Sequence, residues 1–326
     1  MTDSFNRRIS YLRLSVTDRC NLRCVYCMPA EGVALMDHAA ILSYEEMLRI
    51  ARVAAGAGIT KIRITGGEPL VRKGIADLVA ELNHLAGIAD ISITTNGILL
   101  EAAAGALRRA GLRRINISLD TLDPVKYKQI TRGGDLAAVL AGIHAARMEG
   151  FSPIKVNVVV MRGINDAEIT SFAALTMERP VHIRFIEFMP INGHAGLDKS
   201  VYISNADIRE KIQTIGELLP LPIEPGAGPA RLYQLRGAQG KLGFISPLSN
   251  HFCATCNRLR LTADGRLRTC LFSDTETDLR LPLRSGCSDA DLLGLMARAI
   301  FTKPFRHAVL EPSFQKCSRG MSAIGG

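Results

Sequence analysis

Six segments in the first two thirds of the chain alternate apolar with polar residues, and helical stretches lie between them. The segments are 11–17, 61–65, 91–95, 114–120, 154–160 and 181–188. Alternation with a period of two is typical of β-strands that have one apolar and one polar face. Strands that take turns with helices predict an α/β protein built on a parallel sheet.

Capping signals mark the starts of three of these helices. Ser43 with Glu46 has the form of a capping box, and Asp123 stands before Pro124 as an N-cap before a first-turn proline. Asn165 with Glu168 repeats the capping pattern. These signals predict helices that begin near residues 44, 124 and 166.

The polar strand faces constrain the architecture further. Parallel strands covered by helices on both sides are almost continuously apolar, and a filled eight-stranded barrel has an apolar lumen. Here Arg13, Arg63, Thr94 and Lys155 occupy the polar faces. We therefore expect an incomplete (βα)6 TIM-like barrel whose polar lumen holds a ligand. The alternative is a half-solvated sheet with helices on one side.

A Pro/Gly-rich stretch at 215–230 predicts a domain boundary. We expect the partial barrel to span residues 1–215 and a smaller C-terminal domain to span 216–326, with a helix near 289–299. No apolar run approaches the ~18 residues of a membrane span, and the polar N-terminus lacks the apolar centre of a signal peptide. These features predict a cytoplasmic protein without a membrane partner.

The chain carries a basic excess, with 40 Lys and Arg against 31 Asp and Glu and a net charge of +9. Such an excess suits an anionic substrate or a nucleic acid. The sequence has no dense Lys/Arg run, no Trp and only 5% aromatic residues, which disfavours a nucleic-acid surface. An anionic small molecule is the better expectation.

Cys20, Cys24 and Cys27 follow the first predicted strand within eight residues. Three thiolates hold three irons of a four-iron, four-sulfur (4Fe-4S) cluster, and the fourth iron is then open to a small molecule. Structural zinc usually has four ligands in paired short spacings, so zinc fits this set poorly.

This set, with Tyr26 before its last cysteine, resembles the radical S-adenosylmethionine (SAM) superfamily. Gly66, Gly67, Glu68 and Pro69 after the second strand strengthen the resemblance, because glycine lets a backbone approach a ligand closely. The resemblance implies that the open iron binds SAM, and that one electron cleaves SAM to a 5′-deoxyadenosyl radical. It also implies SAM contacts from Tyr26, Gly67, Ser118 and Met189, although Met189 is alternatively a core residue.

A second set consists of Cys253, Cys256 and Cys270. Its spacing leaves two alternatives, a zinc ion with His251 as fourth ligand and a second cluster with an open iron. Arg258 and Arg260 nearby suit an anionic ligand, or they are surface charges. Cys287 and Cys317 match no motif and have the character of small buried apolar residues.

Together these motifs, which run nearly from end to end of the chain, closely resemble the radical SAM branch that cyclises GTP at the start of molybdenum-cofactor biosynthesis. That resemblance implies two 4Fe-4S clusters, one on each cysteine set, and a C-terminal Gly325-Gly326 tail that enters the active site. On sequence alone, without the resemblance, the two terminal glycines indicate a disordered tail. The implied contacts to GTP are Arg13, Arg63, Thr94, Lys155, Arg184, Arg258, Leu259 and Arg260.

The implied reaction removes a hydrogen atom from the ribose C3′ of GTP, after which C3′ attacks C8 of guanine. The implied product is (8S)-3′,8-cyclo-7,8-dihydroguanosine 5′-triphosphate. Implied partners are an electron donor and a cyclic pyranopterin monophosphate synthase that receives the product. The sequence leaves the oligomeric state open, with a homodimer among the alternatives. The alternatives are a radical SAM enzyme that acts on a peptide or methyl acceptor, and a metal-binding regulator.

Overall fold

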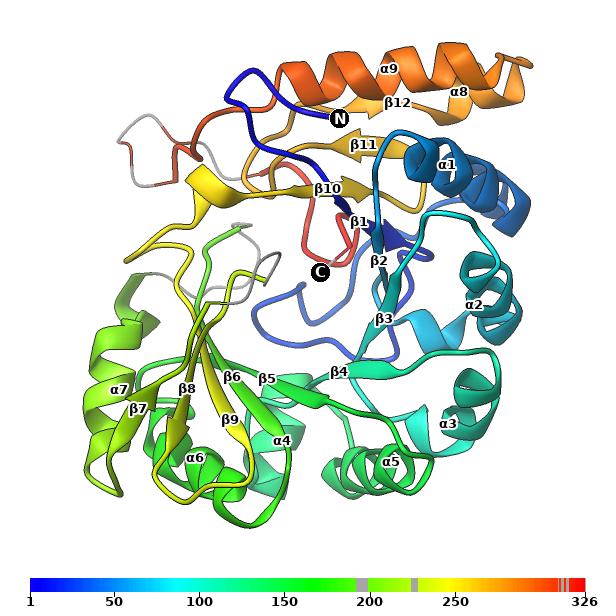
Figure 1. Ribbon diagram of the computed structural model, residues 1–326. Coiled ribbons are helices and arrows are strands. Elements are labelled where there is room, and N and C mark those ends of the chain that lie inside the picture. The colour runs from blue at the N-terminus through cyan, green and yellow to red at the C-terminus, as the bar shows by residue number, and fades with distance from the viewer. Residues whose placement is uncertain (192–198, 224–227, 310, 312–313, 315–316, 326) are drawn as a thin grey trace.

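A computed structural model describes residues 1–191, 199–223, 228–309, 311, 314 and 317–325. One curved sheet of twelve strands organises this part of the chain, in the order β12-β11-β10-β1-β2-β3-β4-β5-β6-β9-β8-β7 (Figure 1). The strands are β1 Tyr11–Ser15, β2 Lys61–Thr65, β3 Asp90–Thr95, β4 Arg114–Ser118, β5 Ile154–Val160, β6 His182–Glu187, β7 Leu218–Pro220, β8 Arg231–Leu235, β9 Lys241–Ile245, β10 Arg258–Leu261, β11 Arg266–Arg268 and β12 Thr277–Asp278.

Helices follow most of the parallel strands and lie on the convex side of the sheet (Figure 1). They are α1 Tyr44–Gly56, α2 Ile75–Asn83, α3 Leu100–Arg109, α4 Pro124–Thr131, α5 Leu136–Met148, α6 Ile169–Glu178, α7 Asn205–Gln213, α8 Arg280–Arg284 and α9 Asp289–Phe301. The six predicted strands and the helix expected near 289–299 are therefore present, with ends shifted by one to two residues.

Local sequence explains where two of the helices begin. Ser43 and Glu46 form the predicted capping box at α1, and the Asp123 side chain accepts hydrogen bonds from two backbone N–H groups at the start of α4. At Asn165 the predicted helical start is confirmed but the predicted cap is not, because a 3-10 turn, Asp166–Glu168, begins directly after Asn165 while the Asn165 side chain does not cap it. That side chain binds the backbone of Met161 and Asp120, and α6 begins at Ile169 without a side-chain cap. Tertiary hydrogen bonds have displaced the local capping pattern there.

The sheet is an incomplete barrel, as expected. Strands β10, β1 to β6 and β9 pair in parallel, and β11, β12, β8 and β7 add antiparallel strands at the two edges. No pairing joins β12 to β7 in the described part of the chain, so the sheet curves without closing. The strands that follow residue 216 extend both edges of this sheet.

The two faces of the sheet have opposite character. Leu12, Leu14 and Ile62 are fully buried in the core between sheet and helices. Polar residues of the other face are also shielded, with Arg13 and Arg260 each 8% exposed. This burial contradicts the half-solvated sheet and supports a lumen that is closed off by other parts of the chain.

The C-terminal tail supplies part of that closure. The chain before the C-terminus runs into the concave side of the sheet (Figure 1), where Ile324 is fully buried. Gly326 lies outside the described residues. None of the helices in the described ranges is long and apolar enough to cross a membrane.

Candidate active site

The concave side of the sheet encloses a cavity of about 660 Å³. Residues from both predicted cysteine sets and from nearly every predicted ligand position line it. They are Arg13, Cys20, Cys24, Tyr26, Cys27, Arg63, Gly67, Thr94, Ser118, Lys155, Arg184, Met189, Cys253, Cys256, Arg258, Arg260 and Cys270. The fold thus gathers positions that lie more than 250 residues apart in sequence around one space.

Leu259 is the exception among the predicted GTP contacts. Its side chain is fully buried in the core on the apolar face of the sheet, because successive residues of a strand point to opposite faces. The structure therefore excludes a contact between the Leu259 side chain and a ligand in the cavity. Arg258 and Arg260, one position to either side, line the cavity.

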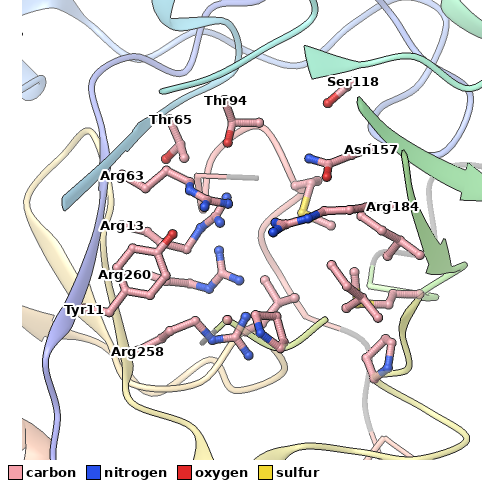
Figure 2. A pocket seen from close by; sticks show the side chains of 18 of the residues that line it. Tyr11, Arg13, Arg63, Thr65, Thr94, Ser118, Asn157, Arg184, Arg258 and Arg260 are labelled. Carbon is pink, nitrogen blue, oxygen red and sulfur yellow. The ribbon is translucent and has the colours of Figure 1, made fainter. Parts of the chain in front are cut away.

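Strand register builds a row of arginines along one wall. Arg13 pairs with Arg260 of β10 on one side and with Arg63 of β2 on the other. Residues in register on neighbouring parallel strands share a face and lie ~4.8 Å apart. Figure 2 shows these three side chains with Arg258 along the wall, and Arg184 reaching towards them from the opposite side.

The crowding of cations shifts their proton affinities. Burial, together with the charges of Arg63 and Arg258, lowers the pKa of Arg13 to about 9. Burial and the neighbouring cations, Arg184 foremost, lower the pKa of Lys155 to about 6. Like charges held together in a shielded space oppose one another, so this wall is arranged for a ligand with several negative charges.

Two polar atoms beside the arginines also indicate a ligand. Thr94 Oγ1 and Arg184 Nε are buried without a hydrogen-bond partner in the described part of the chain. Burying a polar group without a partner costs ~1–3 kcal/mol. Both atoms are satisfied if an oxygen-rich ligand fills the cavity.

Cys20, Cys24 and Cys27 stand on the loop after β1, whose backbone turns tightly between them. Cys27 N donates to Cys24 O at 2.9 Å, and Arg23 Nη1 donates to Cys20 O at 2.7 Å. Burial raises the pKa of Cys27, and the neighbouring charge of Cys20 raises it further. Three thiolates share this space only when cations balance them, which fits the irons of a cluster.

Gly66 and Gly67 are required by the contact between two loops. A Cβ on Gly67 would lie 2.4 Å from Arg19 O, and one on Gly66 would lie 2.7 Å from Thr17 O. Gly67 N donates to Thr17 O at 2.8 Å. The first need for these glycines is therefore the fit of the turn after β2 against the cysteine loop, in addition to any approach to a ligand.

Tyr26 ties the cysteine loop to the end of β4. Its hydroxyl donates to Asp120 Oδ2 at 2.6 Å, and Asp120 Oδ1 accepts from Val159 N at 2.8 Å. Burial raises the pKa of Asp120 to about 6. Cys24, Tyr26, Ser118 and Asp120 line one small pocket, and Gly67 packs against the start of the cysteine loop. Tyr26, Gly67 and Ser118 therefore all lie near the first cysteine set.

The second set occupies the other end of the arginine row. Burial opposes ionisation of Cys256, but the charges of Arg258 and Lys303 outweigh it and lower the pKa of Cys256 to about 6. Thiolate is the form that binds metal. Among the described residues, no three His, Cys, Asp or Glu side chains gather closely enough for a single metal ion, at this set or at the first.

The tail reaches the arginine row. Gly325 O accepts hydrogen bonds from Arg13 Nη2 at 3.3 Å and from Arg260 Nη1 at 3.2 Å. A Cβ on Gly325 would lie 2.9 Å from Thr65 Oγ1, and its φ of +76° favours glycine. The structure thus places Gly325 inside the site that the sequence assigned to it.

Sequence analysis missed several residues of the cavity wall. Tyr11 lies under the Arg63 guanidinium, 5.6 Å from ring centroid to Cζ, and alternation along the strand would have placed it on the same face as Arg13. Asp120 continues the polar face of β4 in the same way. Arg7 and Lys303 line the cavity from loops, where no periodic signal exists.

Comparison with known proteins agrees with this geometry. Residues 14–176 match the Radical SAM superfamily, and residues 181–309 match the family described as Molybdenum Cofactor Synthesis C. The chain is 52% identical over the full length of both chains to the GTP 3′,8-cyclase of Moorella thermoacetica. It is 48% identical to that of Geobacter sulfurreducens, over all of this chain and 99% of the other.

A solved structure shares the fold at low identity. Streptococcus suis SuiB bound to S-adenosylmethionine superposes with a TM-score of 0.65 and 17% identity, over 89% of this chain and 66% of SuiB. The present chain thus spans less than two thirds of the length of SuiB, and the likeness concerns the fold alone. The end-to-end identity to the curated relatives is decisive, and the chain belongs to the GTP 3′,8-cyclase family of the radical SAM superfamily.

Proposed function

We propose that the chain converts GTP to (8S)-3′,8-cyclo-7,8-dihydroguanosine 5′-triphosphate, the first step of molybdenum-cofactor biosynthesis. The observation that supports this best is the layout of the cavity. The first cysteine set follows β1 and the second precedes the parallel strand β10, so the two sets stand at opposite strand ends of the sheet. The arginine row Arg258, Arg260, Arg13 and Arg63 runs along one wall between them. A nucleoside triphosphate fits this layout, because its base can bind at the second cysteine set and its negatively charged phosphates can bind the arginine row.

The SAM end comprises the first cysteine set with Tyr26, Gly67, Ser118 and Met189. Cys20, Cys24 and Cys27 would hold the first 4Fe-4S cluster, which when bound supplies the electron that opens the sulfonium of SAM. The Tyr26–Asp120 hydrogen bond fixes the cysteine loop against β4. Tyr26, Gly67, Ser118 and Met189 line the cavity and would hold SAM there.

The GTP end comprises the second cysteine set and the cations. Cys253, Cys256 and Cys270 would hold the second cluster, whose open iron would be the binding point for guanine. Arg13, Arg63, Lys155, Arg184, Arg258 and Arg260 bind the triphosphate, with Thr94 as a further donor. Each charge-assisted hydrogen bond contributes ~1.5–3 kcal/mol.

Holding the substrate at both ends orients its ribose. SAM, when bound and cleaved by one electron, would supply the radical that takes the C3′ hydrogen, and C3′ would then bond to C8. The external donor would supply one further electron, and solvent a proton, to complete the product. Orientation of this kind is worth up to ~7–11 kcal/mol of the barrier. The buried lumen and the Gly325 tail exclude water from the radicals.

The proposal also includes the partners, the assembly and the two units of the chain. An external electron donor supplies the reducing equivalents, and the product passes to a cyclic pyranopterin monophosphate synthase. A homodimer is the proposed assembly. Residues 1–215 form the radical SAM unit and 216–326 the unit that contributes the second cluster, although their strands share one sheet.

The test is an anaerobic incubation of reconstituted protein with GTP, SAM and a strong reductant. Mass spectrometry should find 5′-deoxyadenosine and the cyclised nucleotide in equal amounts, and iron analysis should find about eight irons per chain for two clusters. Zinc with four or fewer irons would contradict the two-cluster assignment. Deoxyadenosine formed with a peptide but not with GTP would favour a different radical SAM activity.

A further inference from the structure

The first eight residues form a closed turn that is packed against the second cysteine set. Thr2 and Arg8 pair as an antiparallel bridge, and Asp3 Oδ1 accepts hydrogen bonds from the backbone N–H groups of Phe5 and Arg7, both at 2.9 Å. Asp3 is 5% exposed and Arg7 is 7% exposed. A polar N-terminal segment that is buried in this way has a defined place in the structure.

Arg7 connects this turn to the end of the chain. Its Nε donates to Asp3 Oδ2 at 2.6 Å, and its Nη1 donates to Cys253 O at 2.8 Å. The same guanidinium donates to Phe305 O at 2.9 Å and to Pro304 O at 2.7 Å. Arg7 therefore joins the backbone of a cluster cysteine to a loop about 50 residues further along the chain, and Asp3 holds Arg7 in place.

Lys303 performs the same task for the other two cysteines. It is 3% exposed, and its Nζ donates to Arg258 O at 3.2 Å and to Thr269 O. Arg258 stands two residues after Cys256, and Thr269 stands directly before Cys270. The next residue in the chain is Pro304, whose carbonyl Arg7 holds, so the two cations act on adjoining segments.

We propose that Arg7 and Lys303 are positioning residues that hold Cys253, Cys256 and Cys270 in the arrangement needed by the second cluster. The inference rests on the proposed function, because it assumes that this set carries a cluster. Cys253 begins a single 3-10 turn and Cys256 ends it, whereas Cys270 lies two residues after the short strand β11. None of the three is held by strand pairing. Buried cations bonded to the adjacent carbonyls supply the missing rigidity.

The charge of the pair suits the same task. Three thiolates and a cluster carry negative charge into a shielded space, and the buried Lys303 offsets part of it. The charge of Arg7 is balanced by its ion pair with Asp3. Backbone oxygens hold Lys303, and backbone oxygens together with Asp3 hold Arg7, so both contacts stand whether or not GTP is present. The first cysteine set has no contact with either residue among the hydrogen bonds described above.

The test compares Arg7→Met and Lys303→Met with the unaltered protein after anaerobic reconstitution. Iron should fall from about eight to about four per chain. Paramagnetic resonance should show loss of the signal that responds to GTP and retention of the signal that responds to SAM. Asp3→Asn, which weakens the anchor of Arg7 but keeps its donors, should lose a smaller part of the GTP-responsive signal.

Matched controls are Arg236→Met and Lys211→Met, which remove exposed cations paired with Glu217 and Asp166. Both should retain full iron content. Variants of Arg7 and Lys303 that keep both clusters would overturn the inference, and so would equal loss of both, since that indicates general unfolding. If the unaltered protein itself carried one cluster, the proposed function would fail at its second cluster, and this inference with it.

Discussion

The carbonyl oxygen of Gly325 lies 3.2 Å from Nη1 of Arg260, a residue that stands 65 positions earlier in the chain. Nη2 of Arg13 donates to the same oxygen at 3.3 Å. One tail carbonyl therefore orients two of the cations that we assign to the triphosphate. The end of the chain is therefore part of the wall of the site, and this contact explains why a glycine is needed at position 325.

Gly325→Ala should lower product formation at least tenfold. The added Cβ would lie 2.9 Å from Thr65 Oγ1 and 3.0 Å from Ser15 Cβ, and the left-handed backbone costs a further ~1–2 kcal/mol for any residue with a side chain. The tail would then leave the arginine row. Chromatography of the cyclised nucleotide measures the effect, and deletion of Gly325 and Gly326 should abolish product.

Gly150→Ala is the matched control for that substitution. Gly150 has nearly the same φ, +75°, but a Cβ there meets nothing within 4 Å. The Gly150→Ala protein should lose a similar amount of stability and keep the turnover of the unaltered protein. Equal activity of the Gly325 variant and the unaltered protein would return the tail to a role outside catalysis.

Arg260→Ala should raise the KM for GTP while the protein keeps both clusters. Loss of one charge-assisted contact of ~1.5–3 kcal/mol corresponds to a change of about 10-fold to 150-fold. Steady-state kinetics with GTP and iron analysis together make the measurement. Arg266→Ala, on the neighbouring strand in an ion pair with Asp278, should leave the KM for GTP unchanged. Unaltered kinetics in Arg260→Ala would remove this residue from the site.

The amino acid pattern predicts the barrel and its polar lumen because both follow from strand alternation. Arg13, Arg63 and Lys155 share the lumen side with their neighbours because the parity of each strand is visible in its sequence. The register that places Arg260 beside Arg13 is not visible, since β10 follows β1 by more than 240 residues and pairs with it only in the folded chain. Only the family resemblance placed Arg260 and Arg13 in one site, because the alternation along each strand does not show which strands are neighbours.

Residues on loops escaped prediction for a different reason. Arg7 and Lys303 act through backbone carbonyls of distant segments, and no local pattern marks such a contact. At Asn165 a local pattern was present but tertiary hydrogen bonds outweighed it. Leu259 shows the opposite case, in which strand alternation alone would have placed its side chain in the core.

GTP binding should weaken as pH rises above about 6. Burial and neighbouring cations lower the pKa of Lys155 to about 6 in the free protein, so the side chain is mostly neutral at pH 7 or above. A bound triphosphate favours its charged form, raises that pKa and thereby takes up a proton. Affinity then falls with rising pH, by up to about tenfold per pH unit for one proton.

Calorimetric titration with GTP from about pH 5.5 to about pH 8.5 measures this dependence. In Lys155→Met the contribution from the side chain should vanish, and the contributions of GTP itself and of the other titrating groups of the cavity should remain. The difference between the two slopes isolates Lys155. Parallel slopes for the two proteins would show that the side chain does not change its charge when GTP binds.

Glu187→Ala should lower the melting temperature by about 6–12 °C. The carboxylate is fully buried and accepts from the backbone N–H groups of Asn205, Leu248 and Ser249, each at 3.1 Å. Three unpaired donors would cost about 3 kcal/mol or more, and 1 kcal/mol corresponds to ~2–4 °C in a domain of 150–250 residues. Scanning calorimetry measures the shift, and Glu178→Ala on the exposed end of α6 should change it little. Because Glu187 binds the loop that leads to Cys253, GTP turnover should fall together with the melting temperature. A Glu187→Ala protein with a lower melting temperature but full turnover would show that this loop contact does not affect the active site.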